Sequence, residues 1–128
     1  MFATPADLLL ALHMHWHTRL SGEVERELAA EPLELDSAVA RAWREAAASL
    51  PGTRAVLDAH EEDPALAAAQ RKELAYLASA AGLAELADPA APAVGTRVRK
   101  AARAITRQPP DDAGRSGWLG RLLHALAA

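Results

Sequence analysis

Three histidines surround a tryptophan in the stretch HMHWH, residues 13–17, and they are the side chains best suited to chemistry in this sequence. An α-helix turns by about 100° per residue, so His13 and His17 lie about 40° apart on one flank. His15 falls on the opposite side. Two imidazoles spaced i and i+4 can meet one metal ion, as they do in helical zinc motifs. The pair therefore offers two metal ligands on one helix face.

Two ligands do not make a metal site, because structural zinc takes four ligands and catalytic zinc takes three and a water. His60 and Glu61, in the segment HEED, offer the missing nitrogen and oxygen. Together with His13 and His17 they would suit zinc or another divalent transition metal. The competing interpretation places the first two histidines at the edge of a helical core beside Trp16. The chain has no cysteine and no HExxH motif, so we favour this second interpretation and expect no cofactor.

Residues 95–107 predict a basic helix, and Val94, Val98, Ala101 and Ile105 form an apolar edge along it. Such a face could bind phosphates weakly and without sequence preference. It carries no aromatic or amide side chain to stack on a base or read its edge, so we do not expect nucleic acid as the main partner. We favour docking on the acidic body of the protein over a solvated or partner-binding face. The basic face comprises Arg97, Arg99, Lys100, Arg103 and Arg107.

The sequence ends in GWLGRLLHALAA, which predicts a short amphipathic helix near residues 117–127. A helix of this length is marginal alone in water, so its apolar side must be buried against some surface. That surface could be the protein's own body, a second copy, a partner's groove or a membrane. Membrane binding is disfavoured because the segment holds one arginine. The apolar side consists of Trp118, Leu119, Leu122, Leu123 and Leu126.

Helical periodicity runs through most of the chain, and no segment alternates apolar and polar residues as a strand does. The expected fold is all-α, a small bundle of about four main helices plus the basic helix and the C-terminal helix. Thr4 followed by proline is a strong N-terminal capping signal. The main helices are expected over residues 5–30 with a possible break at 21–22, from 36 or 37 to 50, from 54 to 62 after a Thr53 cap, and from 65 to 86.

Charge divides the chain into two parts. Residues 1–88 hold seven basic and fifteen acidic residues, a net charge of −8, whereas residues 89–128 hold seven and two, a net charge of +5. The stretch DPAAPAVG, residues 88–95, is typical of a stiff linker, and a second hinge precedes residue 117. The expected organisation is an acidic bundle over 1–88 and a hinged basic tail over 89–128.

Composition excludes several functional classes. The 128 residues suffice for one domain, and the lack of cysteine excludes disulfides and thiolate chemistry. We find no nucleophile elbow and no phosphate-binding loop. No secretory signal and no membrane span are recognisable, and the bias toward alanine and arginine is typical of a GC-rich bacterial genome, so a cytoplasmic bacterial protein is expected. The favoured function is a non-catalytic interaction or regulatory module that docks a protein partner or itself through the C-terminal helix. The alternatives are a metal-binding bundle and weak nucleic-acid binding.

Overall fold

The computed structural model describes residues 4–106, and every regular element in that range is helical. The prediction of an all-α bundle is therefore confirmed. None of the described helices combines the length and the apolar character that crossing a membrane would require. The elements are α1 (Pro5–Ala29), α2 (Leu35–Ser49), α3 (Pro51–Ala59), the 3₁₀ turn η1 (Pro64–Leu66), α4 (Ala67–Ala80) and α5 (Ala91–Thr106).

The first helix, α1, begins where the capping signal predicts and continues without a break. The Thr4 hydroxyl accepts a hydrogen bond from the backbone N–H of Asp7 at 3.1 Å. The break considered at residues 21–22 does not occur. Glycine costs only about 1 kcal/mol in a helix interior. Leu20 and Val24 lie two residues before and two residues after Gly22, and both are fully buried. Core packing therefore outweighs the cost of this glycine.

Helix α4 ends earlier than its periodicity predicts. It stops at Ala80 because Gly82 adopts a φ of 71°, a left-handed conformation that favours glycine. The N–H of Gly82 donates to the carbonyl of Ser79, and the N–H of Leu83 donates to the carbonyl of Ala78, each at 3.0 Å. These two bonds form a Schellman cap. The predicted extension to residue 86 is therefore wrong.

Two helices have a proline in their first turn that the sequence-based prediction placed outside them. Helix α3 starts at Pro51 rather than after Thr53, and α5 starts inside the predicted linker, with Pro92 in its first turn. Proline suits this position because the first N–H groups of a helix have no partner within the helix. Before α5, the Asp88 carboxylate accepts a hydrogen bond from the N–H of Ala90 at 2.8 Å.

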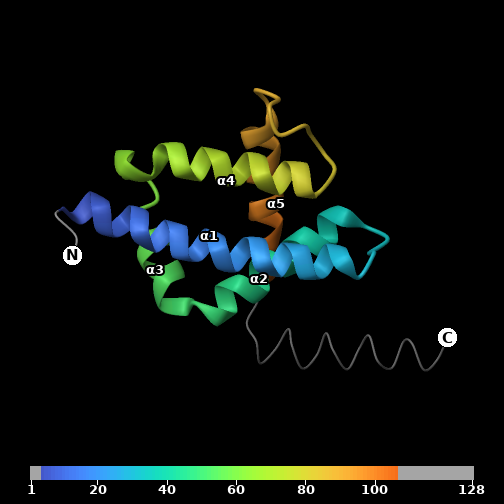
Figure 1. Cartoon of the computed structure of the whole chain (residues 1–128), viewed down its shortest axis with the longest axis horizontal. Coiled ribbons are helices and arrows are strands. Elements are labelled where there is room, and N and C mark those ends of the chain that lie inside the picture. Colours follow the sequence, from blue (N-terminus) through green and yellow to red (C-terminus); the bar gives the residue numbers. More distant parts are fainter. Residues whose placement is uncertain (1–3, 107–128) are drawn as a thin grey trace.

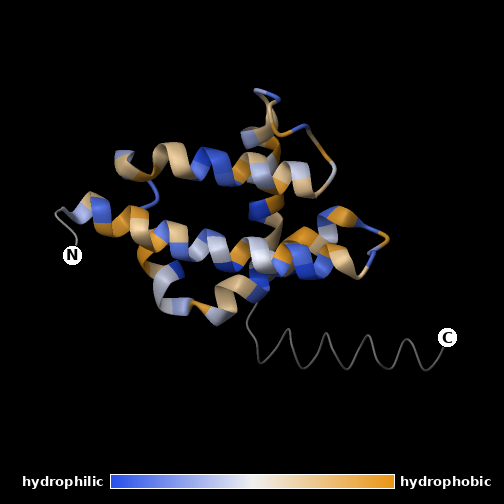
Figure 2. Cartoon of the chain, viewed as in Figure 1, coloured by the Kyte–Doolittle hydropathy of each residue, from blue (hydrophilic) through white to orange (hydrophobic). Residues whose placement is uncertain are grey.

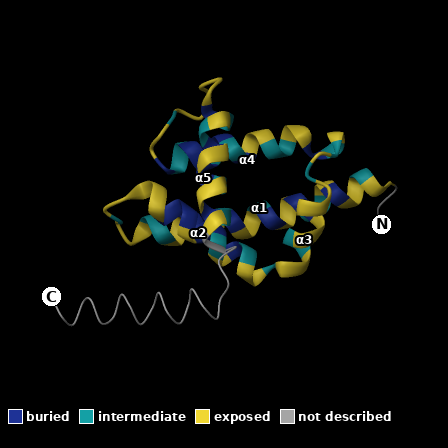
Figure 3. Cartoon of the chain, turned by 180° about the vertical axis from the view of Figure 1, so that it is seen from behind, coloured by how far each residue is buried: buried dark blue, intermediate teal, exposed yellow. Residues whose placement is uncertain are grey.

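The helices enclose a main apolar core, and a smaller buried cluster of alanines lies between α4 and α5. Helix α2 packs along α1, α4 lies beside α1, and α5 crosses behind them and packs on both α4 and α2 (Figure 1). Each helix carries both hydrophilic and apolar residues (Figure 2), and the buried residues gather where the helices meet (Figure 3). The largest fully buried side chains are Trp16, Leu20, Leu57, Leu66, Leu77, Val24 and Val39.

Helix α5 contributes to the same core as α1–α4. Val98 and Ala102 are buried in it. A Cβ atom at Gly95 would overlap the backbone carbonyl of Leu74, so the backbones of α5 and α4 approach closely. The prediction that the basic helix docks its apolar edge on the acidic body is confirmed at Val98. The boundary drawn after residue 88 lies in the turn between α4 and α5.

Candidate functional site

Glu73 places a carboxylate in the interior between α4 and α1. It lies one helical turn before the fully buried Leu77, so both residues are on the inner face of α4. Only 3% of Glu73 is exposed. The indole Nε1 of Trp16 donates a hydrogen bond to Glu73 Oε1 at 2.6 Å. This bond provides a partner that a buried carboxylate requires.

Two imidazoles of α1 lie beside the same carboxylate oxygen. His13 Nε2 is 3.6 Å and His17 Nδ1 is 3.9 Å from Glu73 Oε1. Both nitrogen atoms are buried and lack a hydrogen-bond partner. The two rings are nearly parallel, with centroids 6.3 Å apart, and the His17 ring meets the Tyr76 ring edge to face at 5.3 Å. The expected placement of the histidine pair at the core edge beside Trp16 matches this geometry.

We call Glu73, Trp16, His13 and His17 the Glu73 cluster. Its surroundings favour an ionised Glu73 carboxylate and an uncharged His13. Burial would raise the pKa of the Glu73 carboxyl, but His17, His13, Arg54 and Trp16 outweigh it and hold that pKa below its usual value. Burial lowers the pKa of His13, and this effect exceeds the opposing attraction of the Glu73 carboxylate. At neutral pH the cluster therefore pairs a carboxylate with the uncharged imidazole of His13.

Arg54 of α3 lies against two tryptophans. Its guanidinium carbon is 4.5 Å from the ring centroid of Trp16 and 5.5 Å from that of Trp43. Its Nε and Nη2 atoms both lie 3.0 Å from Asp58 Oδ1. Burial lowers the pKa of Arg54, and the carboxylate of Asp58 opposes this shift. A cation stacked on two aromatic rings and paired with a carboxylate is a stabilising arrangement for a half-buried charge.

Two arginines of the predicted basic face join α5 to the end of α3 and to the turn after it. Arg103 Nη2 lies 2.6 Å from Asp58 Oδ1, and Arg103 Nη1 lies 3.5 Å from Glu61 Oε1. Arg99 Nη2 lies 3.2 Å from the same Glu61 oxygen. The side chains of Arg99 and Arg103 are only 13% and 17% exposed. The expected pairing of these arginines with carboxylates of the body is therefore confirmed.

An open pocket of about 400 Å³ lies over the Glu73 cluster, between α1 and α4. A few polar groups beneath an apolar rim are typical of small-ligand sites. The lining holds one basic and one acidic side chain, Lys72 and Glu73, so the pocket shows no surplus charge of either sign. The lining residues are Leu10, His13, Met14, His17, Thr18, Ala69, Lys72 and Glu73.

The four residues predicted as metal ligands do not meet in one place. His13 and His17 are neighbours, but His60 caps the C-terminus of α3, and its Nδ1 donates to the Val56 carbonyl at 2.9 Å. Glu61 is engaged by two arginines of α5. Between residues 4 and 106, no three histidine or carboxylate side chains are placed to hold one ion. Helix α3 ends at Ala59, so His60 is its C-cap residue. The His60 ring therefore points back toward the last turn of α3.

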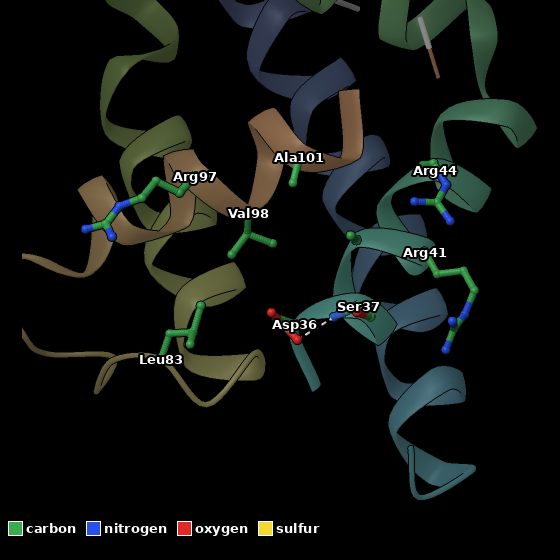
Figure 4. A pocket seen from close by; sticks show the side chains of 9 residues that line it. Asp36, Ser37, Arg41, Arg44, Leu83, Arg97, Val98 and Ala101 are labelled. Carbon is green, nitrogen blue, oxygen red and sulfur yellow. Dashed lines mark hydrogen bonds between the residues drawn. The ribbon is translucent and has the colours of Figure 1, made fainter. Parts of the chain in front are cut away.

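A second concave surface lies between α2 and α5. It has a volume of about 340 Å³, an apolar floor that includes Val98 and Ala101, and arginines on both sides (Figure 4). Arg97 of the predicted basic face stands on the α5 side, and Lys100 is exposed nearby in sequence. We call this surface the α2–α5 groove. Its lining residues are Asp36, Ser37, Ala40, Arg41, Arg44, Leu83, Arg97, Val98 and Ala101.

The sequence analysis missed Glu73, Arg54 and Asp58, which organise the polar interior. One signal was present, because Glu73 lies at helical spacing from Leu77 on a face expected to be apolar. A charged residue on such a face marks a buried pair or a functional group. The partners of Glu73 come from another helix far away in the sequence, so spacing alone could not identify them.

The remaining predicted site residues lie outside the described residues. These are Arg107 of the basic face and the apolar set of the C-terminal segment, Trp118, Leu119, Leu122, Leu123 and Leu126. In comparisons with known proteins, no protein-family model, no curated protein and no solved structure matches this chain. A proposal about function therefore depends on the geometry described above.

Proposed function

We propose that this protein is a small, non-catalytic helical interaction module that docks a protein partner through the apolar side of its C-terminal segment, residues 117–128. The observation that carries this proposal is the core of residues 4–106, which the described helices close among themselves. The docking side chains are Trp118, Leu119, Leu122, Leu123 and Leu126.

The largest side chains of the core are covered by the described helices themselves. Trp16, Leu20, Leu66 and Leu77 are 0% exposed and belong to one cluster formed by the described helices. Helix α5 already covers the surface between α2 and α4. A segment with a tryptophan and four leucines on one side still needs burial, since each fully buried leucine contributes about 2 kcal/mol. A partner's groove is the surface that would supply it.

The two alternative functions gain no support from the described residues. Arg99 and Arg103 pair with carboxylates of the same chain, so two of the five basic residues offered to phosphates are already engaged. His60 and Glu61 lie apart from the histidine pair, so the four residues of the metal-binding alternative are not brought together. We therefore propose only the interaction module as the function.

The test compares partner binding by three forms of the full chain. Partners are captured with the tagged protein, and each captured protein is then purified and titrated with every form. Replacing Leu122 and Leu126 together by glutamate should weaken binding at least tenfold, because buried apolar anchors dominate interface energies. Arg121→Gln, on the opposite side of the predicted helix, is the matched control and should bind as the parent does.

Circular dichroism and thermal unfolding accompany these titrations. All three forms should unfold alike, because the proposal assigns the altered side chains to a partner and not to the core of residues 4–106. Equal binding by the double leucine variant and the parent would refute the proposal. A loss of folding in that variant would refute it as well, because the segment would then be part of the core.

A further inference from the structure

The turn between α1 and α2 presents a large apolar side chain to solvent. Leu33 is fully exposed, at 103% relative accessibility. Glu31 adopts a φ of 52°, a left-handed conformation that is uncommon for glutamate, and Pro32 restricts the next φ angle. The turn projects at one end of the molecule (right in Figures 1 and 2), where apolar and hydrophilic colours adjoin. Glu31 and Glu34 flank the leucine in sequence, so the turn is an acidic segment with an apolar tip.

The α2–α5 groove has the complementary chemistry. Its floor is apolar, and its sides carry Arg41, Arg44 and Arg97, against a single acidic lining residue, Asp36. Arg41 Nε lies 3.2 Å from a carboxylate oxygen of Glu27. Arg44 and Arg97 form no ion pair within the described part of the chain. Figure 4 shows Arg97 on one side of the groove and Arg44 on the other, with Val98 and Ala101 between them.

The turn and the groove are neighbours on the same molecule. The turn leads directly into α2, and Asp36 and Ser37 in the first turn of α2 line the groove. Because Leu33 is fully exposed, it does not occupy the groove of its own chain. Two surfaces that adjoin on one molecule and complement each other can meet reciprocally across a two-fold axis. Each copy then gives its turn and receives its partner's turn, which makes a closed dimer.

We propose that the α2–α5 groove binds the α1–α2 turn of a second copy of this chain. Leu33 of one copy lies on the apolar floor of the other, and Glu31 and Glu34 pair with Arg44 and Arg97. This contact is separate from the C-terminal segment and would leave that segment available to a different partner. Opposite charges across the contact fix its orientation, and the buried leucine supplies its apolar anchor.

Sedimentation velocity of the full chain over a wide concentration range tests this proposal. The parent should sediment as a dimer at high concentration and dissociate on dilution. Dissociation should increase in about 1 M salt, where the screening length falls to about 3 Å. Leu33→Glu should raise the dimer dissociation constant more than tenfold. At concentrations where the parent is monomeric it should leave thermal unfolding unchanged, because Leu33 is fully exposed within its own copy.

Exchanging the charges of Arg97 and Glu34 tests whether the α2–α5 groove is the binding site. Arg97→Glu should dissociate the dimer, and combining it with Glu34→Arg should restore much of the affinity. Leu86→Glu is the matched control, since Leu86 is exposed in another turn and does not line the groove. This variant and a chain lacking residues 117–128 should both dimerise as the parent does. A parent that is monomeric throughout, or a Leu33→Glu variant that dimerises normally, overturns the proposal. Loss of the dimer only on removing residues 117–128 also overturns it and transfers self-association to that segment.

Discussion

Glu73 and its neighbours make the interior of this protein sensitive to protons. The carboxylate accepts a hydrogen bond from Trp16 and lies within 4 Å of nitrogens on His13 and His17. Burial keeps His13 uncharged, and the surrounding donors and charges keep Glu73 ionised. Protonating either group in the folded state is therefore less favourable than protonating it in the unfolded chain.

The sign of the resulting pH dependence follows from these two pKa shifts. The folded-state pKa of His13 lies below its ordinary value of 6.5, so the unfolded chain binds the proton first as pH falls. The free energy of unfolding should therefore be constant above about pH 7.5 and decrease as pH falls through 6.5. Glu73, whose pKa is also lowered, adds a second decrease below about pH 4.5.

Urea unfolding between pH 8 and pH 4 measures this dependence. His13→Gln should lack the decrease that begins near pH 6.5 and keep the decrease at lower pH. His15→Gln, altered on the exposed side of α1, is the control and should follow the parent. A parent whose stability rises on acidification from pH 7 to pH 6 would show that the pKa of His13 is raised on folding instead.

At the scale of the elements, the contact between α4 and α5 depends on a missing side chain. The Leu74 carbonyl occupies the space where a Cβ of residue 95 would lie. Gly22, also inside a helix, has nothing within 4 Å of its Cβ position. The two glycines therefore share a helical setting and differ in what surrounds them.

Replacing each glycine by alanine should give opposite results. Gly95→Ala should lower the free energy of unfolding by about 1–3 kcal/mol, because α4 and α5 must move apart. Gly22→Ala should raise it by about 0.5–1 kcal/mol through helix propensity alone. Thermal and urea unfolding of both variants measure the difference. A stabilising Gly95→Ala substitution would show that the close approach of the two helices is wrong.

The sequence predicted the helices well and their contacts poorly. Apolar stripes and proline caps predict α1 and α2 within a few residues, because these signals are local. The end of α4 was missed because a Schellman cap at Gly82 interrupts an apolar pattern that continues beyond it. The Glu73 cluster and the ion pairs of Arg103 were missed as specific contacts because α1, α3 and α5 supply their partners. Only the general expectation that α5 pairs with an acidic body could be made in advance.

At the scale of the whole molecule, the opposite charges of the two parts of the chain explain the packing of α5. Arg99 and Arg103 bring positive charge to Asp58 and Glu61, and the guanidinium carbon of Arg103 lies 5.6 Å from the ring centroid of Trp43. Three other arginines, Arg41, Arg44 and Arg97, line the α2–α5 groove, which adjoins the acidic turn between α1 and α2. The molecule thus has a closed core and two surfaces proposed for association, the groove with its adjoining turn and the C-terminal segment.

We propose that residues 4–106 form a complete core and leave the C-terminal segment for a partner. Thermal unfolding of residues 1–116, compared with the full chain under identical conditions, tests this claim most directly. A loss of 1 kcal/mol lowers the midpoint of a domain of this size by roughly 4–8 °C. We predict midpoints that agree within about 2 °C and equally cooperative transitions. A truncated chain that fails to fold, or that unfolds more than about 8 °C earlier, would show that the segment belongs to the core and would contradict the account.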